Sequence, residues 1–115
     1  MDSISSVDID PQGRFKYILI NLSDPKSGSK KTIVRGYADC NFHADIFDKV
    51  MPSWKSHGLD ADCPGGGRIL HTPAEKKIIV FGYSTGFGKA DHSVTVELLK
   101  KSYPEYNITW TDEGY

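Results

Sequence analysis

Residues 35–49 read Arg-Gly-Tyr-Ala-Asp-Cys-Asn-Phe-His-Ala-Asp-Ile-Phe-Asp-Lys, a stretch that predicts a strand turning directly into a helix. Asn41 is a favoured N-cap residue, so we expect Phe42 and His43 to hold the first helical positions. Backbone N–H groups in a first helical turn have no partner within the helix. Together with the positive end of the helix dipole, they create an anion-binding geometry.

His43 is the candidate base of this stretch. The helix dipole disfavours imidazolium, so we expect His43 to stay neutral near neutral pH, as a proton acceptor must. A neutral imidazole beside a site for anions suggests phosphate chemistry. The alternative interpretation of the same residues is an exposed first-turn histidine without a chemical role.

The length and the charge balance of the sequence limit the classes of function. With 115 residues the chain is expected to form one domain, 1–115, around a single core. Its 14 basic and 15 acidic residues give a net charge of -1 and are spread along the chain. This balance excludes a broad basic surface for nucleic acid or for an anionic membrane. Any anion is therefore expected to bind locally.

Cysteine usage and apolar runs indicate the compartment. The 2 cysteines, Cys40 and Cys63, are far apart, and no charged-then-apolar leader opens the sequence. Both features are typical of free thiols in a reducing compartment, so we expect a cytoplasmic protein. The longest apolar run, Tyr17 to Ile20, is far too short to cross a bilayer.

Alternating apolar residues and chain breakers predict about six strands and two helices. Residues 1–6 are expected to be disordered. Strands are predicted at 7–10, 15–22, 32–37, 77–83 and 107–110, with a further extended segment across 60–71. Three glycines in that segment permit a bulge or a close backbone approach. One helix should follow Asn41 and end at Gly58, and the other should run from near Asp91 to Pro104. The fold class is thus α/β in the α+β sense, a single mixed sheet with one helix on each face.

Three cations are candidates for binding an anion. Lys16 interrupts an apolar strand near its start, either as a snorkelling lysine at the sheet rim or as an ammonium aimed at a site there. Arg35 lies on an apolar strand face, so its guanidinium needs either a structural carboxylate or a bound oxyanion. Arg68 has two interpretations as well, a phosphate contact or a pair with a surface carboxylate.

A loop of small residues follows the strand 77–83. It reads Ser84-Thr85-Gly86-Phe87-Gly88-Lys89-Ala90 and leads to a helix whose first turn holds His92. Its hydroxyls, glycines and N–H groups suit an anion nest, although a plain connecting loop uses the same residues. The sequence contains no metal-binding, nucleotide-binding, serine-elbow or cysteine-phosphatase motif, so we predict neither a metal nor a cofactor.

Several short stretches, taken together, resemble one known family. They are, in chain order, Val7–Asp10, Phe15–Tyr17, Ile33–Tyr37, His43–Lys49, Gly65–Ile69, Gly82–Ser84, Tyr103-Pro104 and Gly114-Tyr115. In their order and spacing the chain is similar to the protein histidine phosphatases of the Janus/Ocnus family. The motifs His-Ala-Asp-Ile-aromatic-Asp-Lys and Gly-Gly-Gly-Arg are specific, and the resemblance runs from residue 7 to residue 115.

The resemblance implies a small, monomeric, metal-independent phosphatase that acts on phosphohistidine in proteins, releases inorganic phosphate, and takes phospholysine as a second substrate. It implies partners that are phosphohistidine-containing proteins, not nucleic acid or membrane. By motif position, His43 would be the proton acceptor. The phosphate-binding residues would be, in chain order, Lys16, Arg35, Ala44, Ser84, Thr85 and Gly86. Arg68 and His92 would be supporting residues.

Alternatives remain within this interpretation. His43 would take a proton from an attacking water, the route that we favour, or would attack phosphorus itself. A phosphoprotein- or anion-binding regulatory module without turnover would use the same fold, as would a regulator that acts through protein contacts. The sequence departs from the family at 85–88 and in the 24–31 loop. Backbone contacts to phosphate should survive these differences, whereas side-chain preference for substrate need not.

Overall fold

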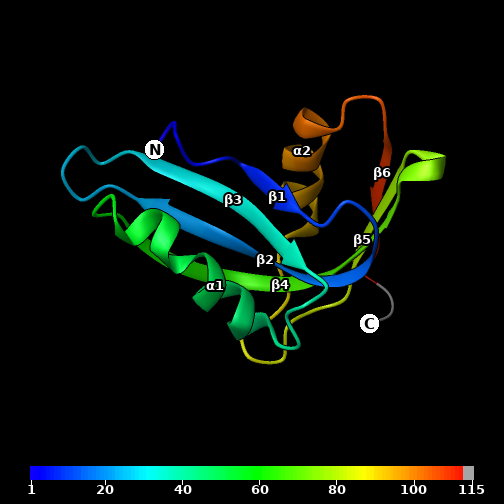
Figure 1. The fold of residues 1–115 in the computed structure, drawn as a ribbon, viewed down its shortest axis with the longest axis horizontal. Coiled ribbons are helices and arrows are strands. Elements are labelled where there is room, and N and C mark those ends of the chain that lie inside the picture. The colour runs from blue at the N-terminus through cyan, green and yellow to red at the C-terminus, as the bar shows by residue number, and fades with distance from the viewer. Residues whose placement is uncertain (113–115) are drawn as a thin grey trace.

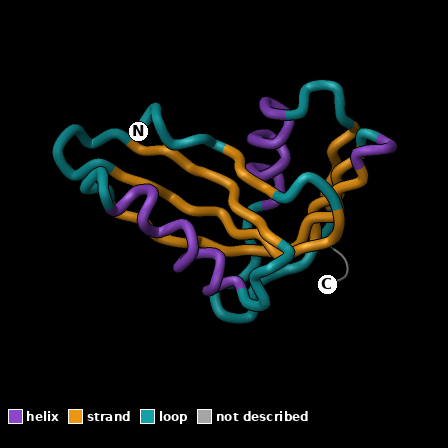
Figure 2. The backbone as a smooth tube through the Cα atoms, in the orientation of Figure 1, coloured by secondary structure: helices purple, strands orange, loops and turns teal. Residues whose placement is uncertain are grey.

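The computed structural model describes residues 1–112 as a six-stranded mixed sheet with two α-helices (Figures 1 and 2). The sequence motif Gly114-Tyr115 lies outside the described residues. The predicted α+β fold class is confirmed. The strands are β1 (Val7–Ile9), β2 (Gly13–Ser23), β3 (Lys30–Tyr37), β4 (Asp60–Thr72), β5 (Lys77–Phe81) and β6 (Asn107–Trp110). The helices are α1 (His43–Lys55), α2 (His92–Ser102) and the short 3-10 helix η1 (Pro73–Glu75).

The order of the strands across the sheet is β1-β3-β2-β4-β5-β6. The inner strands pair antiparallel, and the two edge strands, β1 and β6, pair parallel to their neighbours. Helix α2 contacts both β1 and β6, so the sheet curls around it. Figure 1 shows α1 along the left half of the sheet and α2 near its right half. Helix α2 therefore occupies the concave side of the sheet, and α1 lies on the convex side.

Strand β2 is covered on both faces, as its sequence predicts. Phe15 and Tyr17 belong to the core beneath α2, whereas Ile18 and Ile20 belong to the core beneath α1. Alternate residues of a strand point to opposite faces, so one apolar strand supplies both cores. The prediction of one helix on each face is confirmed.

Helix α1 leaves part of the convex face uncovered. We call this part the open sheet face, and it consists of every second residue of 14–16, 68–72, 77–81 and 107–109. None of these side chains is buried, whereas the residues between them in each strand are all buried against the α2 side. Each residue of the open sheet face is thus at least partly exposed.

The first residues of the chain differ from the expectation of disorder. Ile4 is buried in the core beneath α1, and the ammonium of Lys31 donates to the carbonyl oxygens of Met1 and Ile4. Arg35 donates to the carbonyl oxygen of Ser5 at 2.7 Å. One buried apolar side chain and satisfied carbonyl groups hold a segment that a polar composition alone predicts to be frayed.

The predicted N-cap of α1 is wrong by one residue. The helix begins at His43 with Phe42 at the N-cap, and the Asp45 carboxylate accepts the Phe42 N–H at 2.9 Å. A carboxylate in the first turn therefore replaces the amide expected from Asn41. The helix ends at Lys55 with Ser56 as its C-cap, slightly before the predicted Gly58. Gly58 takes a positive φ of 70° in the turn that follows, and its N–H donates to the Lys55 carbonyl at 3.1 Å.

The glycines of β4 allow the close approach that the sequence predicts. A Cβ on Gly65 would lie 2.6 Å from the Ala90 nitrogen, and one on Gly66 would lie 2.8 Å from Cδ2 of His43. A Cβ on Gly67 would lie 2.7 Å from Cε1 of His92. The pairing of β2 with β4 also shifts register next to this stretch, so the strand contains the predicted bulge as well.

We expect Gly67→Ala to lower the free energy of unfolding by about 3 kcal/mol, because the new methyl group meets backbone and ring atoms that have no room to move. Its Cβ would also lie 2.4 Å from the Phe81 carbonyl oxygen. Gly86→Ala is the matched control, since nothing lies within 4 Å of a Cβ at that position. Urea denaturation of both variants measures the difference, and equal stability would contradict the close packing described here.

Candidate active site

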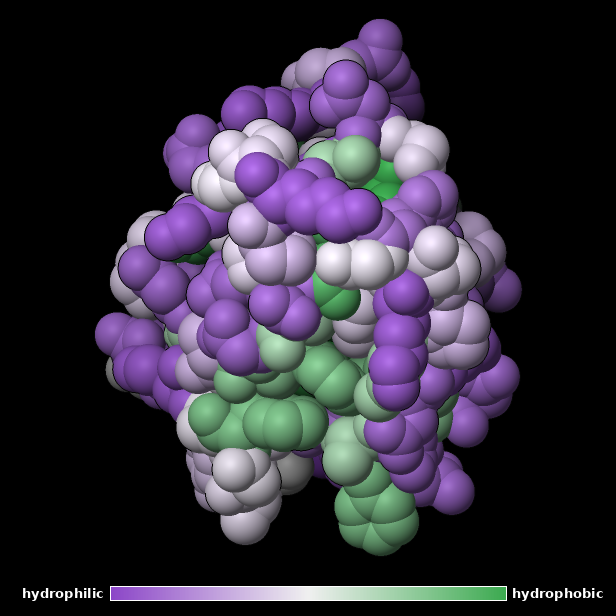
Figure 3. Space-filling view, turned by 90° about the vertical axis from the view of Figure 1, so that its left-hand side faces the viewer, coloured by the Kyte–Doolittle hydropathy of each residue, from purple (hydrophilic) through white to green (hydrophobic). Residues whose placement is uncertain are grey.

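A cleft of about 680 Å³ opens where the start of α1 meets the loop that follows β5. Its walls are formed by Lys16, Phe42, His43, Ala44, Ser84, Thr85, Gly86 and Phe87. Six of these are predicted site residues, which come from three separate parts of the sequence. Figure 3, which views the molecule from the left-hand side of Figure 1, shows hydrophobic side chains gathered in the lower half of that side.

His43 is held in one orientation. Its Nε2 lies 2.9 Å from the carbonyl oxygen of Gly67, and the side chain is 6% exposed. A carbonyl oxygen only accepts, so Nε2 carries the hydrogen and the neutral ring keeps its lone pair on Nδ1. The alternative of an exposed first-turn histidine is wrong, because the ring packs against Gly66 instead of pointing into solvent.

The environment of His43 favours the neutral imidazole. Burial lowers the pKa of His43, and the positive charges of Lys16 and Arg68 act in the same direction. The hydrogen bond to Gly67 partly opposes them. The predicted neutrality thus has burial as its main cause, where the sequence interpretation considered only the helix dipole.

Peptide N–H groups provide a set of anion donors around the cleft. At the start of α1, the N–H groups of His43 and Ala44 have no acceptor within the helix. In the loop, Ser84 and Gly88 bond to each other in both directions, at 3.0 and 2.7 Å. Within residues 1–112, no hydrogen bond uses the N–H of Thr85 or Gly86. Two short segments with peptide donors that are not used elsewhere in residues 1–112 therefore line the same cleft.

Ser84 shapes the loop through its hydroxyl group. The side chain is 2% exposed, and its Oγ accepts the Phe87 N–H at 3.1 Å. That bond closes a tight turn around Thr85 and Gly86. The expected phosphate-binding loop thus depends on Ser84 for its conformation.

Lys16 brings a positive charge to the mouth of the cleft. Its Nζ donates to the Asn41 carbonyl at 2.5 Å and lies 5.4 Å from the centre of the Phe42 ring. Of the two interpretations of this lysine, the structure favours an ammonium directed toward the site over one that merely reaches solvent.

Arg35 lies outside the lining of the cleft, in contrast to the expectation from motif position. It is 5% exposed and donates to the carbonyl oxygens of Val34 at 2.9 Å and Ser5 at 2.7 Å. Main-chain carbonyl groups are thus the acceptors for this guanidinium, where a carboxylate or an oxyanion was expected. Its place on β3, under the N-terminal segment, explains this difference.

Arg68 and His92, the two expected supporting residues, also lie outside the lining of the cleft. The register places Arg68 beside Lys16 in the sheet. His92 lies on the opposite face of Gly67 from His43. Its Nε2 donates to the Gly82 carbonyl at 2.9 Å, and its Nδ1 lies 2.5 Å from the Tyr17 hydroxyl. His92 therefore anchors Gly82, from which the loop begins.

Three features of the site escape prediction from the sequence. The rings of Phe42 and Phe87 form walls of the cleft, and the Gly67 carbonyl orients His43. The pairing of His43 with the glycine stretch depends on a separation of 24 residues. The sequence indicates this contact only through its Gly-Gly-Gly stretch, which permits a close approach of another segment but does not identify that segment.

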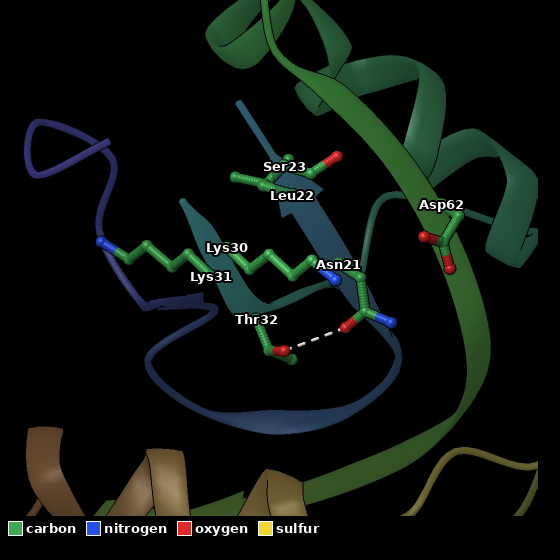
Figure 4. Close-up of a pocket in the computed structure, with 7 residues that line it drawn as sticks. All are labelled: Asn21, Leu22, Ser23, Lys30, Lys31, Thr32 and Asp62. Atoms are coloured by element: carbon green, nitrogen blue, oxygen red, sulfur yellow. Dashed lines mark hydrogen bonds between the residues drawn. The ribbon is translucent and has the colours of Figure 1, made fainter. Parts of the chain in front are cut away.

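A second hollow, of about 400 Å³, lies at the far end of the β2–β3 hairpin (Figure 4). Figure 4 shows the Thr32 hydroxyl bonded to Asn21, a contact of 2.9 Å, with Asp62 to one side. Its lining contains no histidine and no helix terminus. We therefore place the candidate chemistry in the cleft beside His43.

Residues 1–112 lack two further features. No helix in this range is long and apolar enough to cross a lipid bilayer. No group of three or more His, Cys, Asp or Glu side chains gathers there in a way that could hold a metal ion.

Fold and site together define an α+β domain that presents an oriented, neutral imidazole beside a group of oxyanion donors. Comparison with known proteins gives the family. The family model described as the Janus/Ocnus family matches residues 1–107. The chain therefore belongs to the Janus/Ocnus family, and the resemblance noted in the sequence is confirmed.

Individual relatives match over almost the whole chain. The sex-regulated protein janus-A of Drosophila orena is 53% identical over 109 residues, which cover 95% of this chain and 80% of that protein. The 14 kDa phosphohistidine phosphatase of Sus scrofa is 50% identical over 117 residues, covering 97% and 93%. The protein of the same name from Homo sapiens is 48% identical, covering 97% and 94%.

The histidine environment leads to a prediction about pH. Because its pKa is lowered in the folded state, His43 should titrate below the ordinary value of about 6.5. NMR observation of the ring Cε1–H signal during acidification measures the midpoint. A midpoint at or above that value would contradict the described burial.

The same shift affects stability. The unfolded chain, with His43 at its ordinary pKa, binds the proton more readily than the folded one. This contribution therefore destabilises the fold as pH falls below about 6.5, and it reaches its full size below the folded-state pKa. Urea denaturation across this range should show a shallower pH dependence in His43→Gln than in the unmodified chain.

Proposed function

We propose that this chain is a protein histidine phosphatase that hydrolyses the P–N bond of phosphohistidine in proteins. The observation that carries the proposal is the hydrogen bond of His43 Nε2 to Gly67, which leaves the lone pair on Nδ1 of a residue that lines the same cleft as Ala44, Thr85 and Gly86. Two relatives with the name phosphohistidine phosphatase, each about half identical over nearly the whole chain, support it.

Substrate phosphate binds between the two segments that present N–H groups. The donors of Ala44, Thr85 and Gly86 meet the phosphoryl oxygens, and the ammonium of Lys16 neutralises part of their charge. Such pre-oriented donors stabilise the charge that spreads over the three equatorial oxygens in the transition state. Peptide groups need no reorganisation during the reaction, which suits a site on rigid elements.

His43 acts as a general base. A water molecule attacks phosphorus and gives a proton to Nδ1 of His43 as the new O–P bond forms. The P–N bond breaks as this bond forms, and its electron pair goes to the ring nitrogen that held phosphorus. The other ring nitrogen of the substrate imidazole is already protonated, so the imidazole leaves as a neutral group. The products are a protein histidine and inorganic phosphate, and His43 then returns its proton to solvent.

The proposal includes the setting of this reaction. The partners are phosphohistidine-containing proteins, and phospholysine is a second substrate because it has the same P–N bond. The enzyme works in the cytoplasm as a monomer and without a metal ion. Its charges and N–H donors supply the stabilisation that a metal would otherwise give.

The alternative function is a phosphoprotein-binding module without turnover. The similarity to the sex-regulated protein janus-A, whose name specifies no reaction, favours keeping this second candidate. The oxyanion donors alone are sufficient for binding, whereas hydrolysis also needs the lone pair of His43. The two functions therefore differ in what a change at His43 does.

We expect the intact protein to release phosphate from a phosphohistidine peptide in the presence of EDTA, and His43→Ala to release it about a hundredfold or more slowly, the loss typical of removing a general base. His43→Gln serves as a second variant, since an amide can retain the donor to Gly67 with less disturbance of packing. Circular dichroism establishes that both variants are folded.

Three results would decide against parts of the proposal. Absence of release by the intact protein, with peptide binding retained, would establish the binding module. Equal rates for intact protein and both folded His43 variants would remove His43 as the base. Loss of activity in EDTA, restored by a divalent metal, would refute metal independence.

Lys16→Met should lower kcat/KM for the same peptide by about ten- to a hundredfold, because a charge-assisted contact to phosphate is lost. Lys26→Met is the control, since it removes an equal charge from the exposed loop after β2. A comparable loss in both variants would show that only the overall charge of the protein matters.

A further inference from the structure

The candidate active site has two aromatic rings beside its peptide donors. Phe42 lies two residues before the donor Ala44, and Phe87 directly follows the donor Gly86. Each of the two segments that supply donors therefore also supplies an aromatic side chain to the lining of the same cleft. Such a site suits a ligand in which a flat or apolar group is attached close to an anionic one.

Neither packing nor capping explains the side chain of Phe42. It is 67% exposed, more than any other large apolar side chain in residues 1–112. It belongs to neither core, and no aromatic ring within residues 1–112 contacts it. Phe42 also occupies the N-cap of α1, where polar side chains are preferred, and its own side chain makes no capping bond. The ring is therefore not needed to build the fold.

The backbone of Phe42 is nevertheless held in place. Its N–H donates to the Asp45 carboxylate at 2.9 Å, and its carbonyl oxygen accepts the Asp45 N–H at 3.0 Å. Nζ of Lys16 lies 5.4 Å from the centre of the ring. The exposed fraction of 67% leaves ring surface for a ligand beyond this contact. An aromatic side chain on a fixed backbone loses little conformational freedom when a ligand stacks on it.

Phe87 differs from Phe42 in this respect. It is half-buried, packs against the core beneath α1, and has its ring centre 6.2 Å from that of Phe47. Its N–H donates to Oγ of Ser84 at 3.1 Å, which helps to shape the loop. The position of Phe87 thus has a structural explanation, whereas that of Phe42 points to a contact with a ligand.

We propose that Phe42 stacks on the imidazole ring of phosphohistidine and thereby selects phosphohistidine over phospholysine. The inference rests on the proposed phosphatase function and adds a specificity-determining residue to it. The substrate imidazole is bonded directly to phosphorus, so a phosphoryl group held by the peptide donors brings that ring next to the aromatic side chains of the cleft. Stacked rings have centres about 4.5 to 7 Å apart. Phospholysine has the same P–N bond on a flexible alkyl chain, which presents no flat face to Phe42.

The test compares a phosphohistidine peptide with a phospholysine peptide. All flanking residues are Gly or Ala, so only the phosphorylated side chain is available for stacking. We expect Phe42→Leu to lower the ratio of kcat/KM for phosphohistidine to that for phospholysine about five- to tenfold, the size of a typical aromatic pair. Phe42→Tyr should retain the ratio of the intact protein, because it keeps a ring. Circular dichroism establishes that both variants are folded.

The ratio separates stacking from a structural role of Phe42. A disturbed helix start or a displaced Lys16 would slow both substrates alike and leave the ratio unchanged. Comparing variants also cancels the difference in intrinsic reactivity between the two P–N bonds. The control is Trp110→Leu, which removes an aromatic ring that is 44% exposed and lies outside the lining of the cleft. It should give the ratio of the intact protein.

A second measurement needs no turnover. Phenylphosphonate and methylphosphonate each present an anionic group, but only the first has an aromatic ring attached to phosphorus. NMR titration should show that the intact protein binds phenylphosphonate more tightly. The preference should shrink about five- to tenfold in Phe42→Leu and persist in Phe42→Tyr.

The outcomes distinguish this inference from the proposed function. An unchanged ratio in folded Phe42→Leu, with phosphohistidine still hydrolysed, would overturn stacking and leave the phosphatase intact. An equal fall in Phe42→Leu and Trp110→Leu would also overturn it. No hydrolysis of either peptide would instead reject the phosphatase. In that case the phosphonates decide, because equal affinities of the intact protein for both would reject a ring contact at Phe42 as well.

Discussion

The structure depends on the absence of side chains at three consecutive positions of β4. Gly65 is approached by the chain after the 84–88 loop, Gly66 by the ring of His43, and Gly67 by the ring of His92. In each case the space of a Cβ atom is already occupied, so any larger residue would have to displace backbone or an imidazole. The same stretch also bonds in both directions with the chain around Gly88 and Ala90. One short glycine segment thus joins two helix starts and a loop that are far apart in sequence.

Two histidines meet this segment from opposite faces, and the comparison explains what distinguishes the candidate site. His43 and His92 are each the first residue of a helix, and each donates from Nε2 to a backbone carbonyl at 2.9 Å. Burial lowers the pKa of both. They differ at the other ring nitrogen, because Nδ1 of His92 is paired with the buried hydroxyl of Tyr17. The corresponding atom of His43 belongs to a residue that lines a cleft. Equivalent local geometry therefore produces a structural histidine on one face and, on the other, the histidine that we propose as the base.

Much of the fold follows from the sequence, since alternation along β2 and the positions of Gly58 and Asp91 mark a covered strand and two helix boundaries. The cleft follows in outline from the local chemistry of His43 and the 84–86 loop. What could not be predicted are contacts between distant segments. Arg35 donates to the carbonyl of Ser5 because the N-terminal segment packs against the sheet. An expectation of disorder that rests on composition does not predict this contact. The start of α1 is shifted because a carboxylate one turn later competes with Asn41 for the capping role.

The edges of the sheet have a consequence for the behaviour of the chain in a crowded solution. Unpaired N–H and C=O groups of an edge strand are templates for further strands, and long exposed edges promote amyloid-like association. Here the long strands β2 and β4 are interior, while the edges β1 and β6 have only 3 and 4 residues. Both edges also lie against α2. The order of strands therefore places the apolar residues 17–22 of β2 between β3 and β4, where an incoming strand cannot pair with them, so the same arrangement that builds the core limits aggregation.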